Sequence, residues 1–219
     1  TREIPILITT VGNAISSGLA VSFSHPGGNV TGLTSLTVEL NAKRLDLLRQ
    51  LVPGIRRVGF VHDPNNAVDV RNLIQFKTDC EKLGFKSISA PVGKQEEIVQ
   101  TFNQLARDKA QGITVSFTSR IADWRAGIIE QAAKHRLPAM YAQNHFVEAG
   151  GLVSYAPNTQ DLYRRAATYA DKIFKGAKPR DLPIELPLKF ETVINLKTAK
   201  ALGIKIPDVI MLRVDKVIE

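Results

Sequence analysis

The fold of this chain is constrained most by an alternation of strand-like and helix-like segments that runs without interruption from Arg56 to Tyr155. Four apolar runs in this region each end in small or polar residues: Val58–Val61, Ile113–Phe117, Ala139–Tyr141 and Leu152–Tyr155. Amphipathic helices of ordinary length lie between most of these runs. The alternation therefore predicts an α/β fold in which a parallel sheet carries helices on both faces.

The same alternation predicts where a ligand would bind. Ligands of open parallel sheets lie beyond the carboxyl ends of the strands. Polar loops follow the four apolar runs at Asp63–Asn66, Thr118–Arg120, Gln143–His145 and Ala156–Asn158. We therefore expect these four loops to share one edge of the sheet.

Apolar periodicity predicts the remaining elements. The further strands are expected at Ile4–Thr9, Val30–Thr34, Lys86–Ala90 and, as one long strand, Ile184–Leu196. Helices are expected at Leu40–Leu51, Ala67–Leu83, Glu96–Arg107, Ile121–Lys134, Asp161–Phe174, Thr198–Leu202 and Pro207–Val217. The single cysteine, Cys80, falls on the apolar stripe of a predicted helix, which favours a buried structural thiol.

Length and charge limit the classes of protein to consider. A chain of 219 residues with 44% hydrophobic and 23% charged residues can bury a core, as one large domain or two small lobes. No apolar run is long enough to span a membrane, and no signal peptide is visible before Ile4–Ile8, so the chain is cytosolic or begins downstream of its export signal. The net charge of +8 comes from scattered basic residues, and we expect no nucleic-acid partner.

Catalytic and cofactor motifs are missing from the sequence. It holds no phosphate-binding glycine motif and no nucleophile elbow. The four histidines, His25, His62, His135 and His145, are isolated and do not have metal-ligand spacing. His62 ends a predicted strand, but no nucleophile is evident near it. We expect no metal, no cofactor and no enzymatic activity.

The predicted sheet edge carries hydroxyls, amides and aromatic residues instead. A few convergent polar groups beside aromatic walls are typical of a small-molecule pocket. Taken singly, each of these residues is more readily explained as a helix cap or a turn former than as part of a pocket. Their shared edge favours the pocket.

Five segments, in this order along the chain, carry a resemblance to a known family: His25–Gly32, Lys43–Pro53, Phe146–Tyr155, Lys175–Pro179 and Lys189–Gly203. They resemble the ABC-transporter substrate-binding family that includes tryptophan- and other amino-acid-binding lipoproteins. The similarity covers essentially the whole chain.

The resemblance implies a type I periplasmic-binding fold, in which two α/β lobes flank a hinge and trap a small solute. By this likeness residues 35–156 form the second lobe, and residues 1–34 and 157–219 form an incomplete first lobe. Family members carry further β-α units before the strand that matches Ile4–Thr9. The resemblance therefore implies truncation at the N-terminus, with the export signal outside this chain and a periplasmic or membrane-anchored extracytoplasmic location.

The function implied by the resemblance is solute capture for an ABC importer, with an amino acid or a similar small amphipathic molecule as the solute and ABC permease subunits as partners. The ligand-binding residues expected from it are Asn13, Asn65, Asn66, Thr118, Ser119, Asn144 and Tyr155. Arg120 can pair with a carboxylate of the solute. The alternatives are the effector-binding domain of a LacI-type regulator, which shares the fold, and an α/β enzyme.

An incomplete first lobe has a further consequence. The strand at Ile4–Thr9 would present an unpaired edge, which favours recruitment of another chain. We therefore expect two copies of this form to pair as a homodimer through the incomplete lobe.

Overall fold

The computed structural model describes residues 2–36 and 38–219. The chain divides into two compact units, each described here by itself. Unit 1 consists of Thr1–Val38 and Pro157–Phe190, and unit 2 consists of Glu39–Ala156 and Glu191–Glu219.

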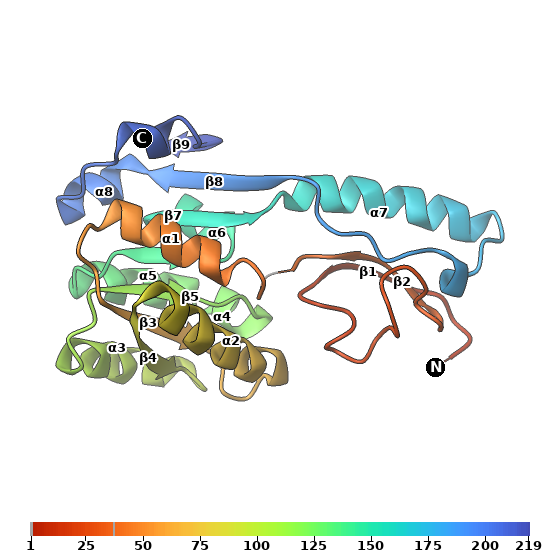
Figure 1. Ribbon diagram of the computed structural model, residues 1–219, viewed down its shortest axis with the longest axis horizontal. Helices are drawn as coiled ribbons and strands as arrows, with labels where there is room; N and C mark the ends of the chain where they lie inside the picture. The colour runs from red at the N-terminus through yellow and green to blue at the C-terminus, as the bar shows by residue number, and fades with distance from the viewer. Residues whose placement is uncertain (1, 37) are drawn as a thin grey trace. The chain divides into compact units, whose positions relative to one another are not determined.

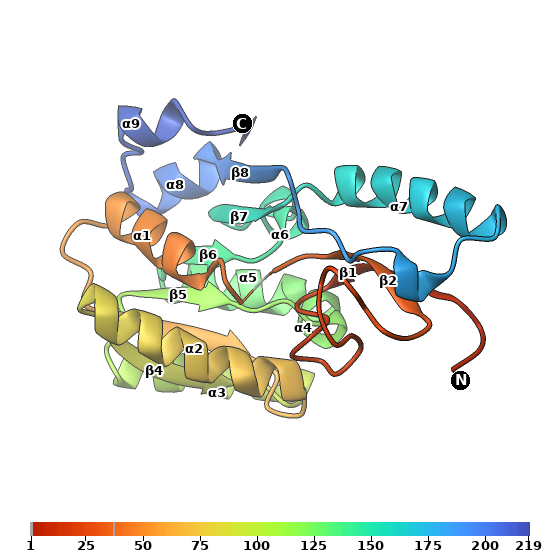
Figure 2. The same cartoon turned by 45° about the vertical axis from the view of Figure 1, so that its right-hand side comes forward.

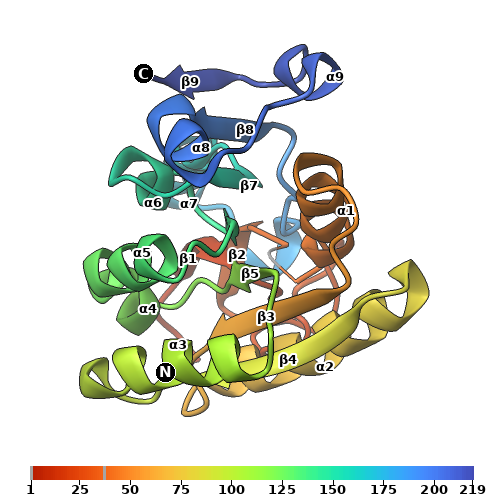
Figure 3. The same ribbon diagram turned by 90° about the vertical axis from the view of Figure 1, so that its left-hand side faces the viewer.

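Unit 2 is built on a seven-stranded sheet in the order β4-β3-β5-β6-β7-β8-β9, as far as the described residues go (Figure 3). The strands are β3 (Arg57–His62), β4 (Lys86–Pro91), β5 (Gly112–Val115), β6 (Ala139–Tyr141), β7 (Val153–Pro157), β8 (Phe190–Asn195) and β9 (Lys216–Ile218). The pairs β3–β4, β3–β5, β5–β6 and β6–β7 are all parallel. The predicted α/β fold with a parallel sheet is confirmed.

Helices cover both faces of this sheet, as the alternation predicts (Figure 3). The helices of unit 2 are α1 (Asn41–Leu51), α2 (Ala67–Leu83), α3 (Ile98–Arg107, after the 3-10 turn Gln95–Glu97), α4 (Ser119–Asp123), α5 (Arg125–Lys134), α6 (Asn144–Glu148), α8 (Leu196–Leu202) and α9 (Asp208–Met211). Side chains of α1 and α2 pack on one face, and those of α3 and α5 on the other.

Apolar clusters fill the space between the sheet and these helices, including one on the α1–α2 face, one on the α3–α5 face and one under α8 and α9. On the α1–α2 face, the rings of Phe60 and Phe76 stack with 4.7 Å between centroids, and Cys80 is fully buried beside them. On the α3–α5 face, Phe102 and Ile128 are fully buried against β5. The expectation of a buried structural cysteine is confirmed, and burial raises the pKa of the Cys80 thiol to about 12.

Unit 1 contains a parallel pair of strands, β1 (Ile6–Val11) and β2 (Val30–Thr34), under the long helix α7 (Thr159–Phe174) (Figure 2). Leu33 of β2 is fully buried against Leu162 and Tyr169 of α7. The segment that follows α7 contains the 3-10 turn η2 (Pro179–Asp181) and returns along β2, where the Glu185 N–H donates to the Gly32 carbonyl at 2.9 Å.

Three sequence predictions are wrong by more than a shift of one or two residues at the ends of an element. The expected strand Ile184–Leu196 is shortened to β8, because Ile184 and Glu185 bond instead to unit 1 backbone. The expected helix Pro207–Val217 is the short α9 followed by β9, because the chain is drawn onto β8 where the Asp215 N–H donates to the Thr192 carbonyl at 2.9 Å. The expected helix Ile121–Lys134 breaks at Trp124, whose φ of −89° and ψ of 7° separate α4 from α5.

The division of the chain also differs from the one expected. Residues 157–219 were assigned together to the first lobe, but the structure places Glu191–Glu219 in unit 2. The physical reason is that β8 and β9 continue the sheet beyond β7. The first boundary falls after Val38 rather than after Thr34.

Candidate functional site

The carboxyl ends of β3, β5 and β6 meet at one edge of the unit 2 sheet because these strands are parallel neighbours. The loops that leave this edge lead into α2, α4 and α6, and Figure 1 shows β5 passing directly toward α4. We call this edge, with residues 63–66, 116–120 and 143–145, the carboxyl edge.

A buried carboxylate ties two of these loops together. Asp69, in the first turn of α2, is 2% exposed. Its Oδ2 accepts hydrogen bonds from the Ser116 hydroxyl at 2.6 Å and from the Asp63 N–H at 2.9 Å. Burial raises the pKa of the Asp69 carboxyl, against the lowering effect of these hydrogen bonds. Asp69 therefore holds the end of β3 against the end of β5.

An anchored guanidinium lies at the same edge. Arg120 Nη1 is 3.5 Å from Asp63 Oδ2, and the Asp63 side chain is 4% exposed whereas that of Arg120 is 50% exposed. The other carboxylate oxygen, Asp63 Oδ1, accepts from the Asn65 N–H at 2.9 Å. Arg120 is thus held on one side by a buried carboxylate and is open to solvent on the other. A half-exposed guanidinium can take a carboxylate in a bidentate pair.

Two of the predicted site residues act as helix caps. The Asn66 side-chain oxygen accepts from the backbone N–H groups of Val68 and Asp69, at 2.9 and 3.2 Å. Thr118 Oγ1 accepts from the Ile121 N–H at 3.2 Å at the start of α4. Asn66 and Thr118 are therefore helix caps, as the alternative to a pocket predicts for them.

Asn65 and Ser119 lie on the surface of the carboxyl edge. Both are exposed, and the Asn65 amide is 3.5 Å from the Gly93 carbonyl, the length of a weak hydrogen bond. Neither side chain caps a helix in the contacts described here, so both can turn toward a solute.

Asn144 belongs to a small polar network. Its amide nitrogen donates to Glu191 Oε2 at 2.8 Å, and its oxygen accepts from the Ser154 hydroxyl at 2.9 Å. Ser154 is fully buried in β7, and Glu191 comes from β8. Glu191 was not predicted as a site residue, because its contact with Asn144 joins residues 47 positions apart.

Tyr155 is half-buried in the middle of β7. Its carbonyl accepts from Arg44 Nε at 2.9 Å, and Arg44 is 2% exposed in α1. Burial lowers the pKa of Arg44 to about 9 and raises the pKa of the Tyr155 phenol. A buried arginine at this position was not expected, since the sequence places it on a helix rich in charged residues.

Asn13 is the one predicted site residue in unit 1. Its side-chain oxygen accepts from the N–H groups of Ile15 and Ser16, both at 3.1 Å. It therefore closes the turn that follows β1. Residues 14–18 form turns.

The carboxyl edge also holds an aromatic pair, which is not among the predicted site residues. The rings of Phe117 and His145 meet edge-on, with 5.8 Å between centroids and 69° between planes. Both residues are half-buried. Burial, aided by Arg125 and opposed by Glu148, lowers the pKa of His145. The signal was present in the sequence, because an aromatic residue ends one strand and a histidine follows the next.

His62 has a structural role. It is 3% exposed, stacks on Phe60 and has its Nε2 3.0 Å from the Ser89 hydroxyl. Burial lowers the pKa of its imidazole. In residues 2–36 and 38–219, no three His, Cys, Asp or Glu side chains are placed to hold a metal.

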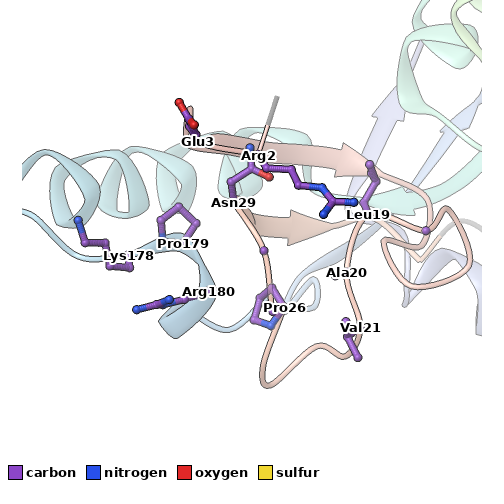
Figure 4. Close-up of a pocket in the computed structure, with 13 residues that line it drawn as sticks. Arg2, Glu3, Leu19, Ala20, Val21, Pro26, Asn29, Lys178, Pro179 and Arg180 are labelled. Carbon is purple, nitrogen blue, oxygen red and sulfur yellow. The ribbon is translucent and has the colours of Figure 1, made fainter.

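Unit 1 has a hollow of about 710 Å³ that does not coincide with these residues (Figure 4). Lys178, Pro179 and Arg180 lie on one side of it, and residues 19–21 on the other. None of the predicted site residues lines it. We place the candidate site at the carboxyl edge, because the anchored cation, the hydroxyls and the aromatic pair occur together there.

Every helix in the described part of the chain is too short or too polar to cross a bilayer.

Comparison with known proteins identifies related sequences and structures. A curated tyrosine-binding protein from Clostridioides difficile is 24% identical over 209 residues, which cover 94% of this chain. The chain spans 59% of the length of that relative. A structure from Streptococcus pneumoniae, described as an ABC domain in complex with L-Trp, is 26% identical with a TM-score of 0.90, over 100% of this chain and 73% of its own.

Other solved structures also resemble this chain. A conserved domain protein from Vibrio cholerae is 26% identical with a TM-score of 0.91, over 99% of this chain and 72% of its own. A LacI family transcriptional regulator from Bifidobacterium animalis, at 13% identity and a TM-score of 0.61, shares the fold alone. These neighbours confirm the type I periplasmic-binding-like fold.

The sequence family described as ABC transporter substrate binding protein matches residues 1–218. Proteins of this family bind substrates and are not enzymes, so the expectation of a non-enzymatic protein is confirmed. This chain belongs to the ABC transporter substrate-binding protein family.

Proposed function

We propose that this protein is the substrate-binding component of an ABC importer and captures an amino acid or a similar small amphipathic solute. The observation that carries the proposal is the carboxyl edge of unit 2. There the Arg120 guanidinium is anchored by the buried Asp63 carboxylate. The same short segment carries the exposed Ser119 hydroxyl and the half-buried Phe117 ring. Ionic and apolar groups at one place suit a solute that has both kinds of surface.

The chemistry of an amino acid fits these groups. Its α-carboxylate matches the open side of Arg120, and the Ser119 hydroxyl and the Asn65 amide offer further polar contacts. The relatives support this solute class, since one is a tyrosine-binding protein and another was solved with L-Trp. Asn13, Asn144 and Tyr155 stay candidates for ligand contact, and Asn66 and Thr118 would contribute through the helices that they cap.

Several parts of the proposal stay predictions. These are capture of the solute between two lobes, delivery to ABC permease subunits and an extracytoplasmic location. If the solute is captured in this way, it stabilises a closed state because it contacts both lobes only there. The LacI-type effector domain, the alternative from sequence, has support at the level of the fold alone.

Calorimetry on the full-length protein against the twenty amino acids, with ribose and arabinose as comparison solutes, tests the proposal. We expect at least one amino acid to bind and neither sugar to do so. Arg120→Ala should weaken that binding by about 1.5–3 kcal/mol, the usual contribution of a hydrogen bond to a charged group. Arg107→Ala, an exposed arginine of α3, is the control and should leave affinity unchanged. Binding of a sugar but of no amino acid would reject the proposal.

We also propose that the 219-residue chain self-associates through unit 1. In the described residues, β1 pairs as a strand only with β2. Ile4, Ile6 and Val21 near this pair are 65%, 40% and 80% exposed. An open strand edge beside exposed apolar residues favours pairing with a second copy. Light scattering at micromolar concentration should give twice the 24.1 kDa chain mass, and a monomer mass would refute the proposal.

A further inference from the structure

We propose that Asn41 and Arg44, at the start of α1, are positioning residues that hold the carboxyl edge in a fixed place relative to two points where the chain changes units. The chain passes between the units after Val38, after Ala156 and after Phe190, and we call the first two points crossings 1 and 2. The inference rests on the proposed function only for its effect on affinity, because its structural part concerns contacts inside unit 2.

Arg44 ties the start of α1 to crossing 2. It is 2% exposed, and its Nε donates to the Tyr155 carbonyl at 2.9 Å. Tyr155 is the last residue but one of unit 2 before crossing 2, and α1 begins at Asn41, the third residue of unit 2 after crossing 1. This hydrogen bond therefore holds together the segments of unit 2 that adjoin both crossings.

Asn41 ties the same end of α1 to α2. Its amide nitrogen donates to the Asn72 side-chain oxygen at 2.6 Å, and the two residues are 3% and 5% exposed. The Asn72 side chain in turn hydrogen-bonds the Asp69 carboxyl, which offsets part of the effect of burial on the pKa of that carboxyl. Three buried side chains thus lead from the start of α1 to the first turn of α2.

The row continues from Asp69 to the half-exposed cation of the carboxyl edge. Asp69 Oδ2 accepts from the Ser116 hydroxyl at 2.6 Å and from the Asp63 N–H at 2.9 Å. The Asp63 carboxylate then lies 3.5 Å from the Arg120 guanidinium. Every residue of the row before Arg120 is at most 5% exposed, so water competes little with these bonds. Connected, packed polar side chains of this kind can couple two places in a protein.

The row is costly to bury, which suits a role in geometry. Burial lowers the pKa of Arg44 to about 9, because the guanidinium has lost its contact with water. Replacing a buried charge by an apolar side chain of similar size is often neutral or stabilising. An apolar side chain cannot supply the directional bond to the Tyr155 carbonyl. We therefore expect Arg44 to fix the position of β7 near crossing 2 more than the stability of unit 2.

Hydrogen exchange on the full-length protein without solute tests the structural part. Urea unfolding followed by the fluorescence of the single tryptophan, Trp124, measures the stability of unit 2. Arg44→Met keeps an unbranched side chain and removes the donor, so exchange at residues 153–157 should accelerate about fivefold relative to residues 98–107, with the urea midpoint unchanged. Arg44→Lys keeps a donor and should stay within about twofold of wild type. Arg49→Met, at an exposed arginine of the same helix, is the matched control and should leave exchange unchanged.

Asn41→Leu tests the other arm of the row without altering Arg44. It removes the amide at similar size, and exchange at residues 63–66 should accelerate about fivefold relative to residues 98–107. For an amino acid that binds the wild type, calorimetry should show affinity about threefold weaker in Asn41→Leu and Arg44→Met, although neither residue is among the proposed solute contacts.

The outcomes separate this inference from the proposed function. Unchanged exchange at residues 63–66 in Asn41→Leu, or at residues 153–157 in Arg44→Met, would overturn the inference. A lower urea midpoint with uniform acceleration across unit 2 in Arg44→Met would do the same, because the role of Arg44 would then be structural only. Unchanged affinity in both variants would remove the link to the site. If the wild type binds no amino acid, the proposed function fails, and the exchange results still decide whether the row positions the carboxyl edge.

Discussion

Replacement of Asp69 by alanine tests whether a buried carboxylate holds the carboxyl edge together. The substitution removes Asp69 Oδ2, which accepts from both the Ser116 hydroxyl and the Asp63 N–H. Both donors belong to buried residues, so water cannot easily replace the lost acceptor. We expect unit 2 to lose stability and the Asp63–Arg120 contact to loosen with it.

The size of the effect follows from the contacts. A buried donor left without an acceptor costs about 1–3 kcal/mol, so two of them cost about 2–6 kcal/mol. Relief from burying the Asp69 carboxylate offsets part of this loss, and we expect a net decrease of about 2–4 kcal/mol in the free energy of unfolding. Asp69→Asn keeps an oxygen that can accept both hydrogen bonds and should lose about 1 kcal/mol.

The chain offers a built-in probe for this measurement. Its single tryptophan, Trp124, lies in unit 2 and packs on the core of the α3–α5 face. Urea unfolding followed by tryptophan fluorescence therefore reports on unit 2. Asp108→Ala, at an exposed position after α3, is the control and should change the free energy by less than about 0.5 kcal/mol. Equal losses for the alanine and asparagine variants would refute the reasoning, because hydrogen bonding would then not be the cause.

The raised pKa of Asp69 predicts that the free energy of unfolding depends on pH. Burial raises its folded pKa above the ordinary value of 3.8, so the folded state binds the proton more tightly than the unfolded state. This group therefore favours folding most below that ordinary value, and its contribution falls as pH rises through the raised folded pKa. Asp69→Asn does not titrate here. The deficit of this variant relative to wild type should shrink as pH is raised from 4 to 7, and a deficit that grows over this range would contradict the prediction.

Two further predictions concern other parts of the chain. Gly32→Ala should open the β1–β2 pair, because its Cβ would lie 2.1 Å from the Ile8 carbonyl oxygen at a φ of 129°, and hydrogen exchange at residues 30–34 should accelerate. Gly28→Ala, with open space around its Cβ, should leave exchange unchanged, and equal exchange in the two variants would reject the clash. Cys80 should react with a thiol reagent at pH 8 only at the rate of unfolding, because burial raises its pKa to about 12, and rapid labelling of native protein would show that the thiol is accessible.

The parts of the fold that depend on local pattern were predictable. The strands at Val30–Thr34 and Ala139–Tyr141 and the helix Ala67–Leu83 have the bounds expected from their apolar periodicity. Asn66 and Gly84 mark the ends of that helix as a cap and as a left-handed residue with a φ of 76°. At these positions the local side chains were sufficient to predict where the elements begin and end.

The errors arise where distant residues decide the local structure. β9 has only three residues, and it is a strand because β8 lies beside it. The segment near Glu185 leaves the expected strand because the backbone of β2 offers it hydrogen bonds. Glu185 and Gly32, which bond there, are 153 positions apart, and no periodicity within a short window encodes such a contact.

The same distinction divides the residues of the candidate site. Sequence placed Asn65, Ser119 and Arg120 on the carboxyl edge because each follows a strand, and the structure keeps them there. It could not place Asp69 or Glu191, since these act through residues 47 positions away in the chain. The seven predicted ligand contacts stay predictions, although Asn66 and Thr118 already have backbone N–H groups as partners.

The residues of the carboxyl edge form an inner, buried layer and an outer, partly exposed layer. The inner layer, with Asp69, Ser116 and Asp63, is buried and its hydrogen bonds form on folding. The outer layer, with Arg120 and Phe117, stays partly exposed. If a solute binds at Arg120 as proposed, it meets a guanidinium that Asp63 already holds in place, and little ordering entropy is then lost on binding. A change in the inner layer should therefore lower stability and affinity together, whereas a change in the outer layer should lower affinity alone.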